Sequence, residues 1–262
     1  MAAHIDVVVH SIERLGRDVC AIDLVATDGA PLPLFGAGAH IEVFIRPNLI
    51  RPYSLCNTPS ERHRYRIGVL RDPKSRGGSQ VIFTQWVVGM PIRISAPRNL
   101  FPLERQAGRS VLIAGGIGVT PLMAMAHTLA ASKSPFELHY CVREREKAAF
   151  LEELQGAGLG KSLRPHFSVE RRFDMAADVR TAGKTDHLYV CGPQGFMDHV
   201  IEEARQLGWS DSQIHFEYFD AETDLSGGAF RVQLASGGEF EIPAGRSIAD
   251  VLIEHGYTRT CS

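Results

Sequence analysis

The sequence predicts two domains, an antiparallel β-barrel followed by an α/β domain with a parallel sheet, and a short C-terminal piece. The first hundred or so residues contain short apolar or alternating runs bounded by glycine and proline, with no long helices between them, as in barrels and sandwiches. After about Ala107, continuous apolar runs alternate with segments of helical spacing, which is typical of a parallel sheet covered on both faces. Alternating runs around Gly237-Gly238 predict a final hairpin.

Six strands are predicted in the first half, together with one helix, Gln80–Val88, which follows Gly77-Gly78-Ser79. Glycine or proline clusters such as Asp28-Gly29 and Thr58-Pro59 separate these runs. The predicted strands are Val7–Ile12, Val19–Val25, His40–Ile45, Tyr53–Cys56, Tyr65–Leu70 and Pro91–Ser95.

The second half alternates strands with helices, and Thr120 and Pro121 suit the N-cap and first position of one helix. The predicted strands are Val111–Ala114, Glu137–Val142, Arg164–Val169, His187–Val190 and Ile214–Phe219, and the helices are Pro121–Ala131, Lys147–Leu154 and Gln194–Leu207. The C-terminal piece is predicted to contain the strands Phe230–Leu234 and Glu239–Ile242 and a helix, Ser247–His255, capped by Ser247. The expected boundaries are 1–104 for the barrel, 105–220 for the α/β domain, 221–229 for a linker and 230–262 for the last piece.

Composition excludes several classes of function. A length of 262 residues suits two domains, and 44% hydrophobic with 22% charged residues is ordinary for a globular protein. The formal net charge of −2 favours neither nucleic acid nor an anionic membrane surface. No apolar run is long enough to span a bilayer, and the N-terminus lacks a signal-peptide pattern.

Cysteine and histidine usage argues against a metal site. The five cysteines are odd in number, scattered and without a C-x-x-C pair, which argues against zinc and suits a reduced, cytoplasmic compartment. His139, His187 and His215 lie in strand-like runs, and we expect them to be structural, hydrogen-bonded histidines. The cysteines are Cys20, Cys56, Cys141, Cys191 and Cys261.

A glycine loop, Gly115-Gly116-Ile117-Gly118, follows an apolar strand and opens a helix. Glycines allow a sharp turn and close approach of a pyrophosphate, and the helix N-terminus attracts phosphates. The spacing departs from the G-x-G-x-x-G fingerprint of dinucleotide-binding folds. A tight strand–helix turn without a ligand remains the alternative interpretation.

A second turn, Cys191-Gly192-Pro193, also connects an apolar strand to a helix. Both turns are expected at the carboxyl edge of the sheet, where ligands bind, and Arg143 follows a strand that ends at the same edge. Cys191 can equally serve as a small buried apolar residue, and Arg143 as a solvated surface residue.

The segment Arg51-Pro52-Tyr53-Ser54-Leu55 offers a cationic fork for a phosphate, an aromatic face and a hydroxyl. An ordinary strand with Tyr53 packed in the core is the alternative. The loop Ser75-Arg76-Gly77-Gly78-Ser79, which precedes the predicted helix, adds a second phosphate-type nest of backbone donors with a charge.

Together, Arg51-x-Tyr53-Ser54, the segment Gly115 to Pro121 and Cys191-Gly192-Pro193 resemble the ferredoxin–NADP reductase superfamily. Three further segments resemble its phthalate dioxygenase reductase and vanillate O-demethylase reductase branch: Arg76–Ser79, Asn99-Leu100-Phe101-Pro102-Leu103 and Glu217-Tyr218-Phe219. The resemblance covers essentially the whole chain. It implies an FMN-binding barrel, an NAD-binding domain and a C-terminal plant-type [2Fe–2S] ferredoxin domain of β-grasp fold.

The resemblance also implies residue roles. Ser54 lies near the reactive edge of the isoalloxazine, Cys191 lies by the nicotinamide, and Glu144 disfavours a 2′-phosphate and so favours NADH over NADPH. The implied FMN contacts are Arg51, Tyr53, Ser54, Gly68, Val69, Leu70, Arg76, Gly77, Gly78, Ser79 and Phe219. The implied NAD contacts are Gly115, Gly116, Gly118, Thr120, Pro121, Arg143, Cys191, Gly192 and Pro193.

One departure from the family concerns the iron–sulfur cluster. The ferredoxin domain of the family carries it on C-x₄-C-x₂-C and a distant cysteine. The sequence ends at Cys261-Ser262, so this ligand set is absent from it, and Cys261 is a candidate for the first ligand. The piece 230–262 is therefore expected to be a partial ferredoxin-like domain.

The implied function is that of the reductase component of a two-component, Rieske-type aromatic oxygenase or O-demethylase. Hydride passes from NADH to FMN, and single electrons pass through a [2Fe–2S] centre to the terminal oxygenase. NADH and the oxygenase are the expected partners of a monomeric chain. Two alternatives stay open: a stand-alone NAD(P)H–flavin reductase or diaphorase, and a non-catalytic nucleotide-binding module.

Overall fold

The computed structural model describes residues 4–47, 49–73, 77–104, 106–179 and 181–219, and most of 228–257. In the last stretch the described residues are 228–234, 237–244, 246, 248–255 and 257. The chain divides into two compact units, one of Ala3–Phe219 and one that contains Asp220–Ser262. Among the described residues, no helix is long and apolar enough to cross a membrane.

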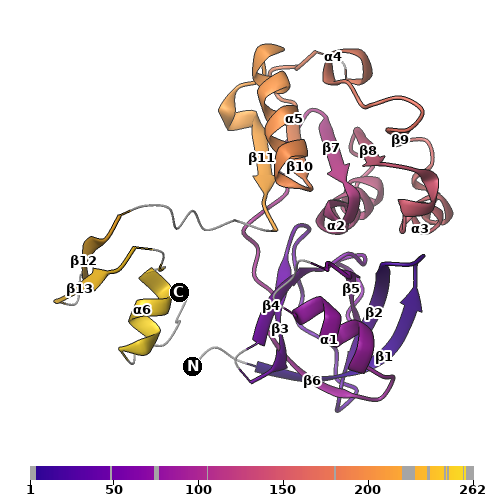
Figure 1. Ribbon diagram of the computed structural model, residues 1–262. Helices are drawn as coiled ribbons and strands as arrows, with labels where there is room; N and C mark the ends of the chain where they lie inside the picture. The colour runs from indigo at the N-terminus through magenta and orange to yellow at the C-terminus, as the bar shows by residue number, and fades with distance from the viewer. Residues whose placement is uncertain are drawn as a thin grey trace. The chain divides into compact units, whose positions relative to one another are not determined.

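The first part of the large unit is a sheet of six antiparallel strands in the order β4-β3-β6-β1-β2-β5 (Figure 1). Buried residues alternate along β3, where Ile41, Val43 and Ile45 face the core, as expected for a sheet with one apolar face. The strands are β1 (His4–Arg14), β2 (Val19–Ala26), β3 (His40–Arg46), β4 (Leu49–Ser54), β5 (Tyr65–Leu70) and β6 (Pro91–Ser95). The predicted barrel-like half is confirmed.

The fourth strand differs from the prediction in its bounds. It begins at Leu49, before the predicted start at Tyr53, and Pro52 lies within it. Proline removes a ladder donor and argues against a central strand, but β4 is an edge strand, where proline is tolerated. Leu55 then forms an isolated bridge with Ile67. The helix α1 (Gly78–Gln85) packs against β3 and β4.

The second part of the large unit is a parallel sheet in the order β11-β10-β7-β8-β9 (Figure 1). Every residue of β7 is buried; Leu112 and Ala114 belong to the cluster that contains α2, and Val111 and Ile113 to the cluster that contains α5. The strands are β7 (Ser110–Gly115), β8 (Phe136–Val142), β9 (Leu163–Phe167), β10 (His187–Cys191) and β11 (Ile214–Glu217), and the main helices are α2 (Val119–Ala131) and α5 (Gln194–Gln206). The predicted α/β domain is confirmed.

Two local predictions in this part were wrong, and one short helix was not predicted. Lys147–Leu154 is not one helix: a 3₁₀ turn, Arg145–Lys147, precedes α3 (Leu151–Leu154), which runs on into a π turn, because Ala148 leaves helical geometry between them. The four-residue helix α4 (Met175–Asp178) was not predicted, because one turn is too short to show a periodicity. Thr120 is not the N-cap: α2 begins at Val119, and the Thr120 hydroxyl donates to the Ile117 carbonyl at 3.0 Å.

The small unit contains the predicted hairpin, β12 (Phe230–Leu234) and β13 (Gly238–Ile242), followed by α6 (Ile248–Glu254). Gly237 turns the hairpin at φ +88°, a conformation that favours glycine. Ile242 and Val251 are its buried apolar residues among those described. Most of the predicted linker and the predicted cap Ser247 lie outside the described residues.

Candidate active site

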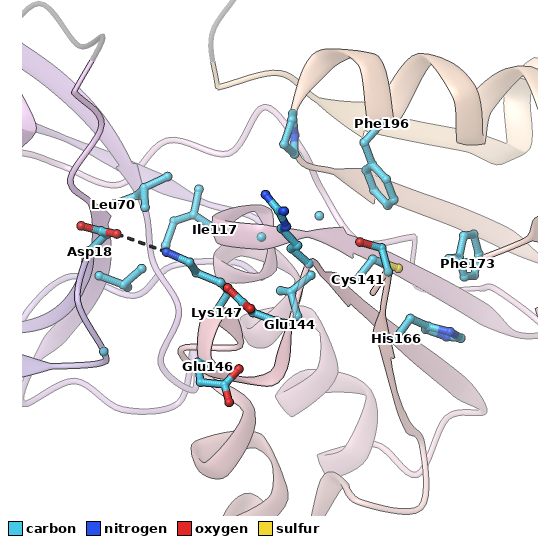
Figure 2. Close-up of a pocket in the computed structure, with 18 of the residues that line it drawn as sticks. Asp18, Leu70, Ile117, Cys141, Glu144, Glu146, Lys147, His166, Phe173 and Phe196 are labelled. Carbon is cyan, nitrogen blue, oxygen red and sulfur yellow. Dashed lines mark hydrogen bonds and ion pairs between the residues drawn. The ribbon is translucent and has the colours of Figure 1, made fainter. Parts of the chain in front are cut away.

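A cleft of about 930 Å³ opens at the carboxyl edge of the parallel sheet, within the large unit (Figure 2). It is walled on one side by the barrel and on the other by the turns that follow the parallel strands. The barrel contributes Leu15, Gly16, Arg17, Asp18, Val19 and Leu70, and the sheet contributes Gly115, Gly116, Cys141, Arg143, Glu144, Pro193 and Phe196 among others. A cleft at this edge is where open α/β sheets bind ligands.

The glycine loop lies on the cleft, but its glycines serve two purposes. Gly116 has φ +55° and nothing within 4 Å of where a Cβ would stand, so its backbone faces open space. Gly118 is packed instead: a Cβ there would lie 2.2 Å from the carbonyl oxygen of Cys191. A Cβ on Gly192 would lie 2.9 Å from the Cα of Gly115. Gly118 and Gly192 therefore let the two predicted turns touch backbone to backbone, Gly115 leaves room for the side chains of Phe196 and Pro193, and Gly116 gives the open turn.

Cys191 is fully buried at the end of β10, and its side chain does not belong to the cleft lining. Burial and the nearby Glu217 raise the pKa of its thiol well above the ordinary value, so the thiol stays protonated and uncharged. This placement matches the interpretation of Cys191 as a small buried apolar residue. Its backbone, which contacts Gly118, is the part that shapes the loop.

Glu217 is a functional candidate to which the sequence reasoning gave no role beyond the family motif. It ends β11 in register with Cys191. Its Oε2 atom is buried and finds no hydrogen-bond partner within the described part of the chain, and burial raises the pKa of the carboxyl group to about 7. An acidic residue that ends the strand beside the Cys-Gly-Pro turn is the sequence signal that could have identified it. A buried orphaned oxygen of this kind requires an explanation.

Arg143 and Glu144 both line the cleft, as does Leu70 from β5. The other two β5 residues that were predicted to line a flavin, Gly68 and Val69, do not line this cleft. Val69 is fully buried in the barrel core, and Gly68 lies beneath Thr120 and Phe150, 2.6 and 2.8 Å from where its Cβ would stand. The predicted contacts Thr120 and Pro121 are buried in α2, and Phe219 is 39% exposed at the end of the large unit.

The predicted flavin segment lies on β4 beside the N-terminus of α1. The side chain of Arg51 crosses Gly78, where a Cβ would come within 3.0 Å of Arg51 Cγ, so glycine is needed for the guanidinium stem to lie against the helix start. Gly77 has φ +92°, which suits a nest of backbone donors. Burial raises the pKa of the Tyr53 phenol, and Ser54 is 6% exposed. Arg76 lies outside the described residues, and the Ser79 hydroxyl accepts a bond from the amide of Asp72 at 3.3 Å.

The histidines predicted to be structural form hydrogen-bonded pairs. His139 Nδ1 lies 3.0 Å from His166 Nε2, and His187 Nδ1 lies 2.8 Å from His215 Nε2. His166 lines the cleft near Cys141 and Phe173 (Figure 2). Burial and the neighbouring His139 lower the pKa of His166 to about 4, so this end of the cleft carries no imidazolium charge at neutral pH.

A plant-type iron–sulfur cluster does not fit the described residues. Such a cluster is held by four cysteine thiolates. The four described cysteines are free, and three of them are buried. No group of three or more His, Cys, Asp or Glu side chains in the described part of the chain is arranged to hold a metal ion. Cys261, the candidate first ligand, lies outside it.

Comparison with known proteins gives one family match and close relatives over nearly the whole chain. The family described as oxidoreductase NAD-binding domain matches residues 112–202. The vanillate O-demethylase oxidoreductase of Pseudomonas putida is 51% identical over 257 residues, which cover 96% of this chain and 81% of the relative. The phthalate dioxygenase reductase of Burkholderia cepacia is 39% identical over 249 residues, which cover 92% and 77%.

A solved structure is similar to this chain over nearly its whole length. Phthalate dioxygenase reductase, described as a modular structure for electron transfer from pyridine nucleotides to [2Fe–2S], matches with a TM-score of 0.82 and 36% identity. The match covers 99% of this chain and 83% of that one.

Proposed function

Because the chain belongs to the family of oxygenase reductases that includes vanillate O-demethylase oxidoreductase and phthalate dioxygenase reductase, we propose that it takes hydride from NADH onto FMN and supplies a terminal oxygenase with electrons. The observation that carries the proposal is the cleft at the carboxyl edge of the sheet, one wall of which is Leu70 of the barrel. A nucleotide bound in this cleft would reach Leu70 at the end of β5, which contacts β4, the strand of the proposed flavin site.

The proposed flavin site is on the barrel. Arg51 and the start of α1 hold the phosphate of FMN, because a guanidinium beside a helix N-terminus is doubly suited to a dianion. Tyr53 and Ser54 lie two and three residues farther along the same strand, and in the proposed site they offer an aromatic ring and a hydroxyl to the ring system of the flavin. Bound FMN supplies a hydride acceptor that releases its electrons singly.

The proposed nucleotide site is the cleft. The exposed backbone of Gly116 and the helix that follows receive the diphosphate, and Arg143 adds a cation at the same edge. Glu144 disfavours a 2′-phosphate by charge repulsion, which favours NADH. The protein contributes orientation and exclusion of water. Cys191 keeps the floor of the loop apolar, and Glu217 ends the adjoining strand with a buried carboxyl group whose pKa burial raises to about 7.

The proposed acceptor is an oxygenase component that acts on an aromatic compound, since the relatives named above serve an O-demethylase and a dioxygenase. The site residues proposed above account for the chemistry as far as the reduced flavin. We also propose that the chain is monomeric and acts in the cytoplasm. The unpaired state of the described cysteines supports a reducing compartment, and light scattering after gel filtration tests the monomer.

Anaerobic spectroscopy tests the proposal. Purified protein is loaded with FMN, freed of excess flavin and titrated with NADH. We expect the bound flavin absorbance to bleach with about one equivalent of NADH, and NADPH to be much less effective. A protein that retains no FMN supports the nucleotide-binding module instead. A flavoprotein that NADH cannot reduce contradicts the proposed hydride transfer.

A further inference from the structure

One face of β5 is turned toward the parallel-sheet part of the large unit. Successive residues of a strand point to opposite sides, so Arg66, Gly68 and Leu70 share a face, while Ile67 and Val69 are buried in the barrel core. Leu70 lines the nucleotide cleft, Gly68 lies beneath Thr120 and Phe150, and Arg66 donates to Glu153 at 3.1 Å. This face therefore runs from the half-buried Arg66–Glu153 ion pair to the cleft.

The facing segment is equally regular. Lys147, Phe150 and Glu153 are spaced by three residues, and each contacts the barrel: Lys147 bonds Asp18 at 3.3 Å, Phe150 covers Gly68, and Glu153 accepts from Arg66. Figure 2 shows the Lys147–Asp18 pair in the cleft wall. We call these six residues, Asp18, Arg66, Gly68, Lys147, Phe150 and Glu153, the seam.

Arg66 is the most constrained member of the seam. Its side chain is 8% exposed, and its guanidinium donates to Asp23 at 3.1 and 3.2 Å, to Glu13 at 2.6 Å and to Glu153 at 3.1 Å. Asp23 and Glu13 belong to the barrel, whereas Glu153 belongs to the other part. A planar guanidinium binds several carboxylates in fixed directions, so it fixes orientation as well as distance. A charge buried this deeply must be paired.

The seam bears directly on the proposed chemistry, because Thr120, which covers Gly68, is the second residue of α2, the helix that follows the glycine loop. A shift at Gly68 would therefore displace the residues next to the proposed diphosphate loop. Hydride transfer depends on the distance and angle between donor and acceptor, and a misplacement of about 1 Å can lower a rate by about 10²-fold.

We infer that Arg66 and Glu153 are positioning residues for hydride transfer, which hold the nucleotide-binding part at the distance from the flavin barrel that the reaction needs. This inference rests on the proposed function. Neither residue lines the cleft, so both act through the seam and not by contact with a reacting group.

The test compares Glu153→Gln with Glu13→Gln. Both substitutions remove one carboxylate from the same guanidinium, but Glu13 links Arg66 only to the barrel. Arg64→Met is a second control, because Arg64 pairs with Asp23 and Glu61, both within the barrel. FMN-loaded proteins are mixed with saturating NADH in an anaerobic stopped-flow instrument. The limiting rate of flavin reduction, the apparent Kd of NADH and the long-wavelength charge-transfer absorbance are recorded.

We expect Glu153→Gln to lower the limiting rate about tenfold or more and to weaken the charge-transfer absorbance, with NADH affinity changed less than about threefold. Both controls should stay within about twofold of wild type. Arg66→Lys should retain part of the rate that Arg66→Met loses, since it keeps the charge without the fork. In the protein without flavin, amides of residues 147–154 should exchange faster in Glu153→Gln than in Glu13→Gln.

Equal rates and equal exchange in Glu153→Gln and Glu13→Gln overturn the inference while leaving the proposed function standing. A wild-type flavin that NADH does not reduce overturns the proposed function itself, and the exchange data then report separately on whether the seam joins the two parts.

Discussion

Replacing Gly118 with alanine should disable the nucleotide loop by a steric route that the structure defines. The φ of Gly118 is −59°, so alanine carries no backbone strain there. The added Cβ would instead lie 2.2 Å from the Cys191 carbonyl oxygen and 2.6 Å from the Gly192 nitrogen, where ordinary contact begins at 3.4 Å. Both atoms are backbone, so no rotamer change relieves the clash, and the two turns must separate by about 1 Å.

The clash should lower the free energy of unfolding by about 3 kcal/mol, the upper end of the usual range for overpacking. For a unit of this size, that lowers the melting temperature by roughly 6–12 °C. Because the displaced backbone belongs to the proposed diphosphate site, the Kd of NADH should rise at least tenfold, which corresponds to about 1.4 kcal/mol. Differential scanning fluorimetry and NADH titration of the purified variant measure both quantities.

Gly195→Ala is the matched control. Gly195 is the second residue of α5, beside the same cleft, and nothing lies within 4 Å of where its Cβ would stand. Alanine there should raise stability by roughly 0.5–1 kcal/mol, because it favours the helix. If Gly118→Ala matches Gly195→Ala in melting temperature and NADH affinity, then the close contact of the two turns is required neither for stability nor for NADH binding.

Three further predictions concern the proposed flavin site and Glu217. Arg51→Met should weaken FMN binding by about 1.5–3 kcal/mol, measured by flavin fluorescence. Arg46→Met is the control, because Arg46 bonds Gln85 at the far end of α1, and it should change FMN binding little. Equal losses in both variants would contradict the role of Arg51 in phosphate binding. Ser54→Ala should slow flavin reduction by NADH more than it weakens FMN binding, and an unchanged stopped-flow rate would exclude that role. Glu217→Gln should stabilise the protein relative to wild type at pH 8 but not at pH 4. The Glu217 carboxyl group has a pKa of about 7 in the folded protein and 4.5 in the unfolded chain, so between these pH values the folded state binds the extra proton. The stability of the wild type therefore falls as pH rises from about 4.5 to about 7, whereas glutamine does not titrate. Urea unfolding of both proteins at several pH values measures the difference, and a gap independent of pH would refute the buried-acid assignment.

The two sheets could be predicted because their signals are local. The all-buried run of β7 and the alternation along β3 are visible in the sequence as hydrophobic patterns. The bounds of β4 were missed because edge position, which permits Pro52, depends on strand order, and order is not a local property. The break between Lys147 and Leu151 lies where Lys147 bonds Asp18 of the barrel, and helical spacing reveals neither the break nor the contact.

The candidate site was predictable in part. The glycine loop and the Cys-Gly-Pro turn were expected at one edge, and both lie there, but the structure requires Gly118 and Gly192 because the backbones of the two turns touch. The sequence cannot show that contact, since Gly118 and Cys191 are far apart along the chain. The same holds for Arg66 and Glu153, which are 87 residues apart, and for the orphaned oxygen of Glu217, which exists only because the fold buries it.

The central claim is direct transfer of hydride from NADH to the bound flavin, and an isotope effect on that step tests it most directly. The FMN-loaded protein is reduced anaerobically with saturating NADH and with NADH deuterated at either C4 position, and flavin bleaching is followed in a stopped-flow instrument. The account predicts slower bleaching with one of the two labels only, because a nicotinamide bound between the two walls of the cleft would turn a single face toward the barrel. Bleaching at the same rate with both labels, or no bleaching at all, would contradict it.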